Sequence, residues 1–127
     1  MMFRMAPDSL SDDIRELVVK CIDSVAQLEA LLFLRDHSGL GFDVASLARH
    51  LFASESAVEV ALARLQSDGF IKQEKGTFRY DASPELNEKV DRLAASYRKH
   101  LVPITNLIHS KPGAARSFSD AFRFRKE

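Results

Sequence analysis

The sequence has little of what stabilises secreted proteins or anchors a chain in a membrane. Cys21 is the only cysteine among 127 residues, so no disulfide can form within one chain, which is typical of the reducing cytoplasm. The longest apolar run, residues 30–34, is far too short to span a bilayer. Arg4 and Asp8 interrupt the first ten residues, and no apolar segment of a secretory signal follows them. We therefore expect a cytoplasmic protein.

The chain also lacks net charge, since 18 Lys and Arg balance 18 Asp and Glu. Attraction to nucleic acid by overall charge alone is thereby excluded. The charge is unevenly placed, however: residues 1–43 hold four basic and eight acidic side chains, and residues 85–127 hold nine and five. An acidic beginning and a basic end indicate either that the two pair with each other or that a basic tail faces an anion.

Patterns typical of enzymes are missing as well. The sequence has no glycine-rich phosphate loop, no nucleophile elbow and no paired-carboxylate signature. Cys21 lies on the apolar face of a predicted helix, where a buried structural thiol is more common than a reactive one. We therefore expect that the protein is not an enzyme and binds no cofactor. We also expect no metal site, because the histidines are scattered without the paired spacing of metal ligands: His37, His50, His100 and His109.

Two helices are predicted in the first third of the chain. Apolar residues recur at helical spacing over residues 12–22, and either Ser9 or Ser11 is placed to cap that helix. Ser24 and the glutamine three residues later form a capping-box pattern, which predicts a second helix over residues 25–37. Its middle turns have almost no polar face. A helix that is apolar on every side is buried, so this one should be the central helix.

A pair of short helices is predicted next. Asp43 is a good N-cap for a helix over residues 44–51, whose apolar side chains share one face. Residues 52–53 then form a tight turn, and Ser54 caps a fourth helix. Gly69 is placed to end that helix in the left-handed conformation that glycine adopts readily.

Short strands follow the fourth helix. Residues 70–74 and 77–81 are strand candidates, and the connection Lys75-Gly76 is a hairpin signal, although Asn-Gly would be a stronger one. Residues 40–42, before the third helix, form a candidate minor strand.

A long helix is predicted after the hairpin. Ser83 is its N-cap and Pro84 its first residue. Pro103 should kink this helix, residues 111–113 break it, and a last helix covers residues 114–126. The long helix has the strongest apolar stripe in the chain: Leu86, Val90, Leu93, Tyr97, Leu101, Ile104 and Ile108.

The order of elements over residues 43–81 resembles the winged helix-turn-helix of bacterial transcription factors. Residues 44–51 look like the first helix of that motif, residues 54–65 like its recognition helix, and residues 65–71 like the exit into the wing. The flanking helices resemble a MarR-like layout. The resemblance implies a mainly α fold, a winged helix-turn-helix with a small β-hairpin wing and extra N- and C-terminal helices. It implies a single domain over residues 1–127, with N-terminal helices at 12–37, the helix-turn-helix and wing at 43–81, and C-terminal dimerisation helices at 84–127.

The function implied by the resemblance is a DNA-binding transcriptional regulator that acts as a homodimer on double-stranded DNA. The recognition helix would enter the major groove, and the wing cations would hold phosphates. The DNA-contacting residues would be Ser54, Ser56, Glu59, Val60, Arg64, Lys72, Lys75 and Arg79. The dimer interface would be formed by Leu86, Val90, Leu93, Tyr97, Leu101, Ile104, Phe118 and Phe122.

The recognition helix departs from the family pattern in its charge. Its exposed positions carry one arginine and two glutamates, Glu55 and Glu59, where many DNA readers carry several cations. A glutamate accepts a hydrogen bond from cytosine but repels phosphates, and Glu55 can simply complement the helix N-terminus. The sequence therefore leaves two hypotheses open: a DNA-binding regulator, or a winged-helix module that binds a protein and not DNA.

Overall fold

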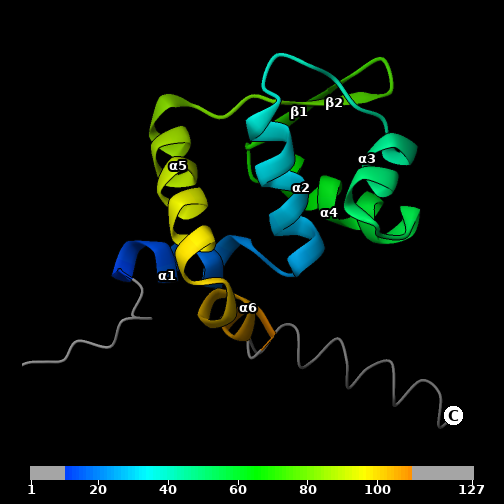
Figure 1. Ribbon diagram of the computed structural model, residues 1–127. Coiled ribbons are helices and arrows are strands. Elements are labelled where there is room, and N and C mark those ends of the chain that lie inside the picture. The colour runs from blue at the N-terminus through cyan, green and yellow to red at the C-terminus, as the bar shows by residue number, and fades with distance from the viewer. Residues whose placement is uncertain (1–10, 110–127) are drawn as a thin grey trace, which may run out of the picture.

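The computed structural model describes residues 11–109 as a helical fold with one small β-hairpin (Figure 1). The mainly α fold with a wing is thus confirmed. The predicted helix over residues 114–126, with Phe118 and Phe122, lies outside the described residues. In chain order the elements are α1 (Asp12–Cys21), α2 (Val25–Asp36), α3 (Val44–Leu51), α4 (Glu55–Ser67), β1 (Ile71–Glu74), β2 (Thr77–Tyr80), α5 (Pro84–Lys99) and α6 (Leu101–His109).

The helices begin where the sequence places their caps. The side chains of Ser24, Asp43, Ser54 and Ser83 each accept a hydrogen bond, at 2.8–3.2 Å, from the amide three residues later. Each bond satisfies one of the N–H groups that a helix N-terminus leaves without an intrahelical partner. Ser11 is the N-cap residue of α1 but forms no such side-chain bond.

α2 is the central helix, as predicted. In Figure 1 it stands between α5 on one side and α3 and α4 on the other, while α1 and α6 lie below. Leu28, Leu31 and Leu34 of α2 are fully buried. They share one core with apolar residues from every other helix and from the hairpin, among them Val18, Leu47, Leu62, Phe78, Leu93 and Ile104.

The wing is held at its turn and at its base. Lys75 and Gly76, the two turn residues, both have positive φ, as the tightest hairpin turns require. Phe42 forms an isolated bridge with Phe78 of β2, so the minor strand predicted at residues 40–42 is reduced to one bridged residue. Gly41 is required beside it, because an added Cβ would lie 2.7 Å from the Thr77 hydroxyl.

The long C-terminal helix is the main correction to the sequence prediction. Instead of one helix kinked at Pro103, the chain forms α5 and α6, separated at His100, whose backbone leaves the helical region (φ −129°, ψ 50°). Pro103 then lies in the first turn of α6. There its missing N–H costs nothing, because first-turn amides have no intrahelical partner. The break lets α5 and α6 both pack against α1.

Candidate nucleic-acid interface

The candidate interface is built from α3, α4 and the wing. α3 and α4 pack against each other through a turn at Phe52 and Ala53, and the Ala53 amide donates to the Ala48 carbonyl at 3.0 Å. Phe52 adopts the left-handed conformation that closes this turn (φ 54°). The expected helix-turn-helix is therefore present.

The face of α4 turned away from the core carries three of the eight side chains expected to meet DNA. Ser56, Glu59 and Val60 are exposed, and Val60 is 72% exposed, while Val58 and Leu62 face the core. Ser54 is the N-cap of α4, as predicted, and its contact with DNA stays a prediction. Its hydroxyl caps α4 by accepting from the Ala57 amide at 3.1 Å and lies 3.3 Å from the Ser56 hydroxyl.

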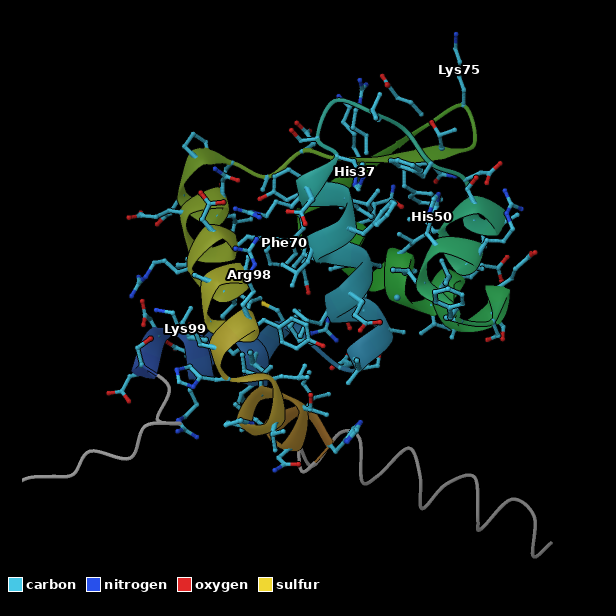
Figure 2. All side chains as sticks on the ribbon, in the orientation of Figure 1. His37, His50, Phe70, Lys75, Arg98 and Lys99 are labelled. Atoms are coloured by element: carbon cyan, nitrogen blue, oxygen red, sulfur yellow. The ribbon has the colours of Figure 1, made fainter. Side chains whose placement is uncertain are left out.

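The three wing cations differ in their surroundings. Lys75 stands at the tip and points away from the fold (Figure 2). Arg79 is ion-paired with Glu74, and the Lys72 ammonium lies 4.0 Å from a carboxylate oxygen of Asp81. Within the part of the chain that the structure describes, Lys75 is thus the wing cation without a carboxylate partner.

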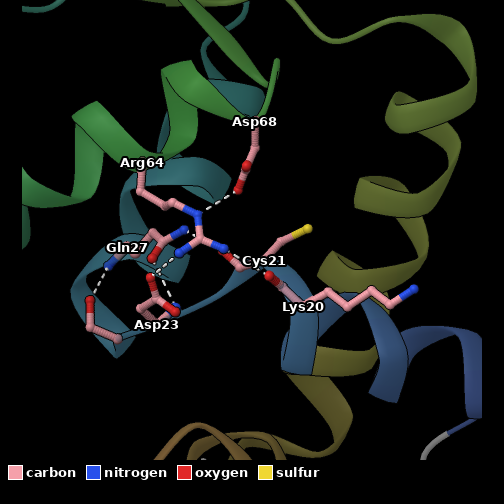
Figure 3. A network of polar contacts seen from close by, with 7 residues as sticks. Lys20, Cys21, Asp23, Gln27, Arg64 and Asp68 are labelled. Atoms are coloured by element: carbon pink, nitrogen blue, oxygen red, sulfur yellow. Dashed lines mark hydrogen bonds and ion pairs between the residues drawn. The ribbon is translucent and has the colours of Figure 1, made fainter. Parts of the chain in front are cut away.

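Arg64, the one arginine predicted on the recognition helix, is half-buried, and its partners belong to the protein itself. Its guanidinium donates to Asp68, to Asp23 and to the Lys20 carbonyl (Figure 3). The hydrogen bond to Asp68 is the main cause that raises the pKa of Arg64, so the group is charged at every physiological pH. The expected role of Arg64 at a phosphate stays a prediction, and this placement does not favour it.

An aromatic cluster fixes α3 and the wing to the end of α2. The Phe33 ring stacks on His37 at a centroid distance of 4.2 Å, lies 4.9 Å from His50 of α3, and meets Phe42 edge-on at 5.0 Å. His37 caps the C-terminus of α2, as expected for a histidine near a helix C-terminus. Because Phe42 also bridges to β2, the cluster links the helix-turn-helix to the hairpin.

Phe52 is a surface feature that the sequence did not single out. It is 97% exposed, and it adopts a backbone conformation that is unfavourable for a bulky residue. With Ala45, Arg49 and Glu55 it lines a shallow hollow at the turn. The sequence indicated a tight turn here but gave no sign that its aromatic ring would face water.

The residues predicted for a dimer interface lie mostly in the core of the single chain. Val90, Leu93 and Ile104 are fully buried, and Leu86 and Tyr97 are half-buried against the same core. Burial is also the main reason that the pKa of Tyr97 is raised. Among the members of the set that lie in residues 11–109, Leu101 is the exposed one. A single chain does not test the dimer, which stays a prediction.

Residues 11–109 contain neither a metal-binding cluster nor a membrane-spanning helix. No group of three or more His, Cys, Asp or Glu side chains there is placed to hold a metal ion. None of the helices among these residues has the length and apolar character needed to cross a membrane.

Solved structures share this fold at low sequence identity. A MarR-family protein of Mycobacterium tuberculosis in complex with DNA has a TM-score of 0.54 and 16% identity, and the match covers 91% of this chain and 86% of that one. A MarR-family transcriptional regulator of Silicibacter pomeroyi has a TM-score of 0.51 and 20% identity, covering 89% and 77%. The reduced form of MarR from E. coli has a TM-score of 0.50 and 12% identity, covering 87% and 80%.

These likenesses show the fold, a winged helix with the MarR-like arrangement of flanking helices that the sequence predicts. No model of a protein family matches the sequence, and no curated protein matches it.

Proposed function

We propose that this protein is a DNA-binding transcriptional regulator that acts as a homodimer. The observation that carries the proposal is the arrangement of α3, α4 and the wing. α4 turns an exposed face outward beside a hairpin whose tip carries Lys75. An exposed helix of this kind fits the major groove, and a cationic hairpin tip suits the phosphates beside it.

The roles follow from the chemistry of each side chain. Ser56 and Glu59 offer hydrogen-bonding groups to base edges, and Val60 offers an apolar surface to a thymine methyl group. Lys75 supplies a phosphate contact that carries no sequence information. Arg79 contributes only when a phosphate displaces Glu74. We propose no catalytic role, and we place the protein in the cytoplasm with DNA.

A homodimer would present two copies of α4 to half-sites about one helical turn apart. The exposed apolar residues on the terminal helices support this part of the proposal. Val19 of α1 and Leu101 and Val102 of α6 remain exposed in the single chain. Covering them with a second copy would remove apolar surface from water.

The decisive experiment is binding of the full chain to a pool of genomic DNA fragments, followed by sequencing of the recovered DNA. Binding is measured at about 50 mM and at about 200 mM salt, because phosphate contacts weaken as salt rises. Recovery of a shared two-fold symmetric sequence supports a dimeric regulator. Absence of any complex at the lower salt contradicts it.

The second candidate is a module that binds a protein instead of DNA. Two observations favour it: Glu55 and Glu59 make the exposed face of α4 acidic, and Phe52 displays an aromatic ring to solvent. The variant Glu59→Lys separates the candidates. In a DNA reader it raises non-specific DNA affinity and blurs selectivity, whereas in a protein-binding module it damages partner binding and the wild type binds no DNA.

A further inference from the structure

We propose that Arg64 is a positioning residue, which locks the recognition helix α4 to the turn between α1 and α2 and so couples α4 to the terminal helices. The inference rests on the proposed function, because it assigns α4 to DNA. It differs from the role suggested by sequence, in which Arg64 itself would meet DNA. A positioning role and a direct DNA contact predict different results in the experiments below.

The geometry of the Arg64 guanidinium carries the first step. Nε donates to Asp68 Oδ2 at 2.8 Å, Nη2 donates to the Lys20 carbonyl at 2.8 Å, and Nη1 donates to Asp23 Oδ2. A guanidinium is a rigid planar fork, so partners on all three nitrogens fix its orientation. One partner lies at the end of α4 itself, and the other two belong to the end of α1 and the turn after it (Figure 3).

The turn between α1 and α2, which Arg64 contacts, is also stabilised by hydrogen bonds from the side chain of Gln27. Gln27, only 1% exposed, donates from Nε2 to the Cys21 carbonyl at 2.6 Å and accepts at Oε1 from the Asp23 amide at 2.8 Å. This differs from the predicted capping box, in which Gln27 would reach back to the Ser24 amide. Gln27 therefore holds the turn from the core side while Arg64 holds it from the α4 side.

The Arg64–Asp23 contact connects α4 to a group of helices, α1, α2 and α5, that are themselves joined by ion pairs. Arg92 pairs with Asp13, which ties α5 to α1, and Arg35 pairs with Asp91, which ties α2 to α5. Among the ion pairs of the described residues, the one that reaches α4 from this group of helices is made by Arg64. A shift of α1 relative to α2 would therefore pull on the C-terminal half of α4 through the Arg64 side chain.

The first test compares the salt dependence of DNA binding for Arg64→Ala and Lys75→Ala. If Arg64 positions α4, Arg64→Ala weakens binding roughly 2- to 30-fold at every salt concentration and leaves the slope of log K against log salt unchanged. Lys75→Ala is the matched control, and it lowers the slope by about one unit. A slope that falls equally in Arg64→Ala would overturn the proposal, because it would place Arg64 at a phosphate.

The second test needs no DNA, so it stands even if the proposed function fails. Amide hydrogen exchange is measured in the free full chain for wild type, Arg64→Lys and Asp23→Asn, conservative changes chosen to keep the chain folded. Loss of the fork should speed exchange in two places at once, the α1–α2 turn and the last turn of α4. Exchange unchanged in either place contradicts the coupling.

Discussion

Arg79 on β2 is ion-paired with Glu74 on β1, so the wing neutralises one of its own cations. Both side chains are partly open to solvent, with relative exposures of 38% and 56%. Ion pairs of this kind are weak, and a DNA phosphate would compete with the glutamate for the arginine. The wing therefore offers Lys75 to a phosphate directly and Arg79 only after exchange.

Replacing Lys75 with alanine should weaken binding to all DNA sequences about equally. A phosphate contact releases counterions, so its loss should lower the salt slope by about one unit. Fluorescence anisotropy over a salt series with two unrelated duplexes measures this. Glu74→Gln is the matched opposite, which frees Arg79 and should tighten binding to both duplexes. A Lys75→Ala effect confined to one duplex would show that Lys75 reads bases.

Val60 should contribute to specificity through thymine methyl groups, because its exposed side chain has no hydrogen-bonding group. Deoxyuridine lacks only that methyl group. Changing the contacted thymine to deoxyuridine in a selected site should weaken wild-type binding about fourfold, the value of one buried methyl-sized group. Val60→Ala should bind both duplexes alike. Equal wild-type affinity for every deoxyuridine duplex would remove Val60 from the readout.

The sequence predicted the fold well where local chemistry decides it. Four capping side chains, the left-handed Gly69 and the Lys75-Gly76 turn all lie where their residue types indicated. Each of these features depends on a few neighbouring residues, so a single sequence is sufficient to identify it.

The sequence was less informative where distant residues decide. The stripe from Leu86 to Ile108 is compatible with one kinked helix and with two helices. In the structure the chain breaks at His100 and both helices pack against α1, a contact that the stripe alone does not predict. The orientation of the Arg64 guanidinium depends on Asp23, which lies 41 residues away in the sequence. No periodicity of the sequence reveals that contact. Only a three-dimensional fold brings such pairs together.

Phe52→Gly should stabilise the protein. Phe52 is 97% exposed and has a φ of 54°, so glycine loses almost no packing and removes about 1 kcal/mol of backbone strain. The thermal midpoint, followed by circular dichroism, should rise by about 4 °C. Gly69→Ala is the converse control, since φ is 88° there, and should lower the midpoint. A lower midpoint for Phe52→Gly would refute the strain assignment.

Cys21→Ala should leave DNA binding unchanged and cost about 1 kcal/mol of stability. Cys21 is half-buried against the core, and its backbone carbonyl, which alanine keeps, accepts the bond from Gln27. Chemical denaturation measures the stability and anisotropy measures the binding. Rapid labelling of the native thiol by a maleimide would contradict this structural role.

The homodimer is best tested at exposed residues of α6 and not at the buried residues of the apolar stripe. Leu93 is fully buried, so Leu93→Asp should unfold the chain and report nothing about assembly. Leu101 and Val102 are 51% and 63% exposed, so Leu101→Asp with Val102→Asp should keep the helical circular dichroism of the wild type. In a homodimer that uses α6, the double variant should sediment as a monomer at tens of micromolar, roughly ten times the dissociation constant of a micromolar dimer. A wild type that is itself monomeric at that concentration would end the homodimer proposal, and a dimeric double variant would move the interface away from this end of α6.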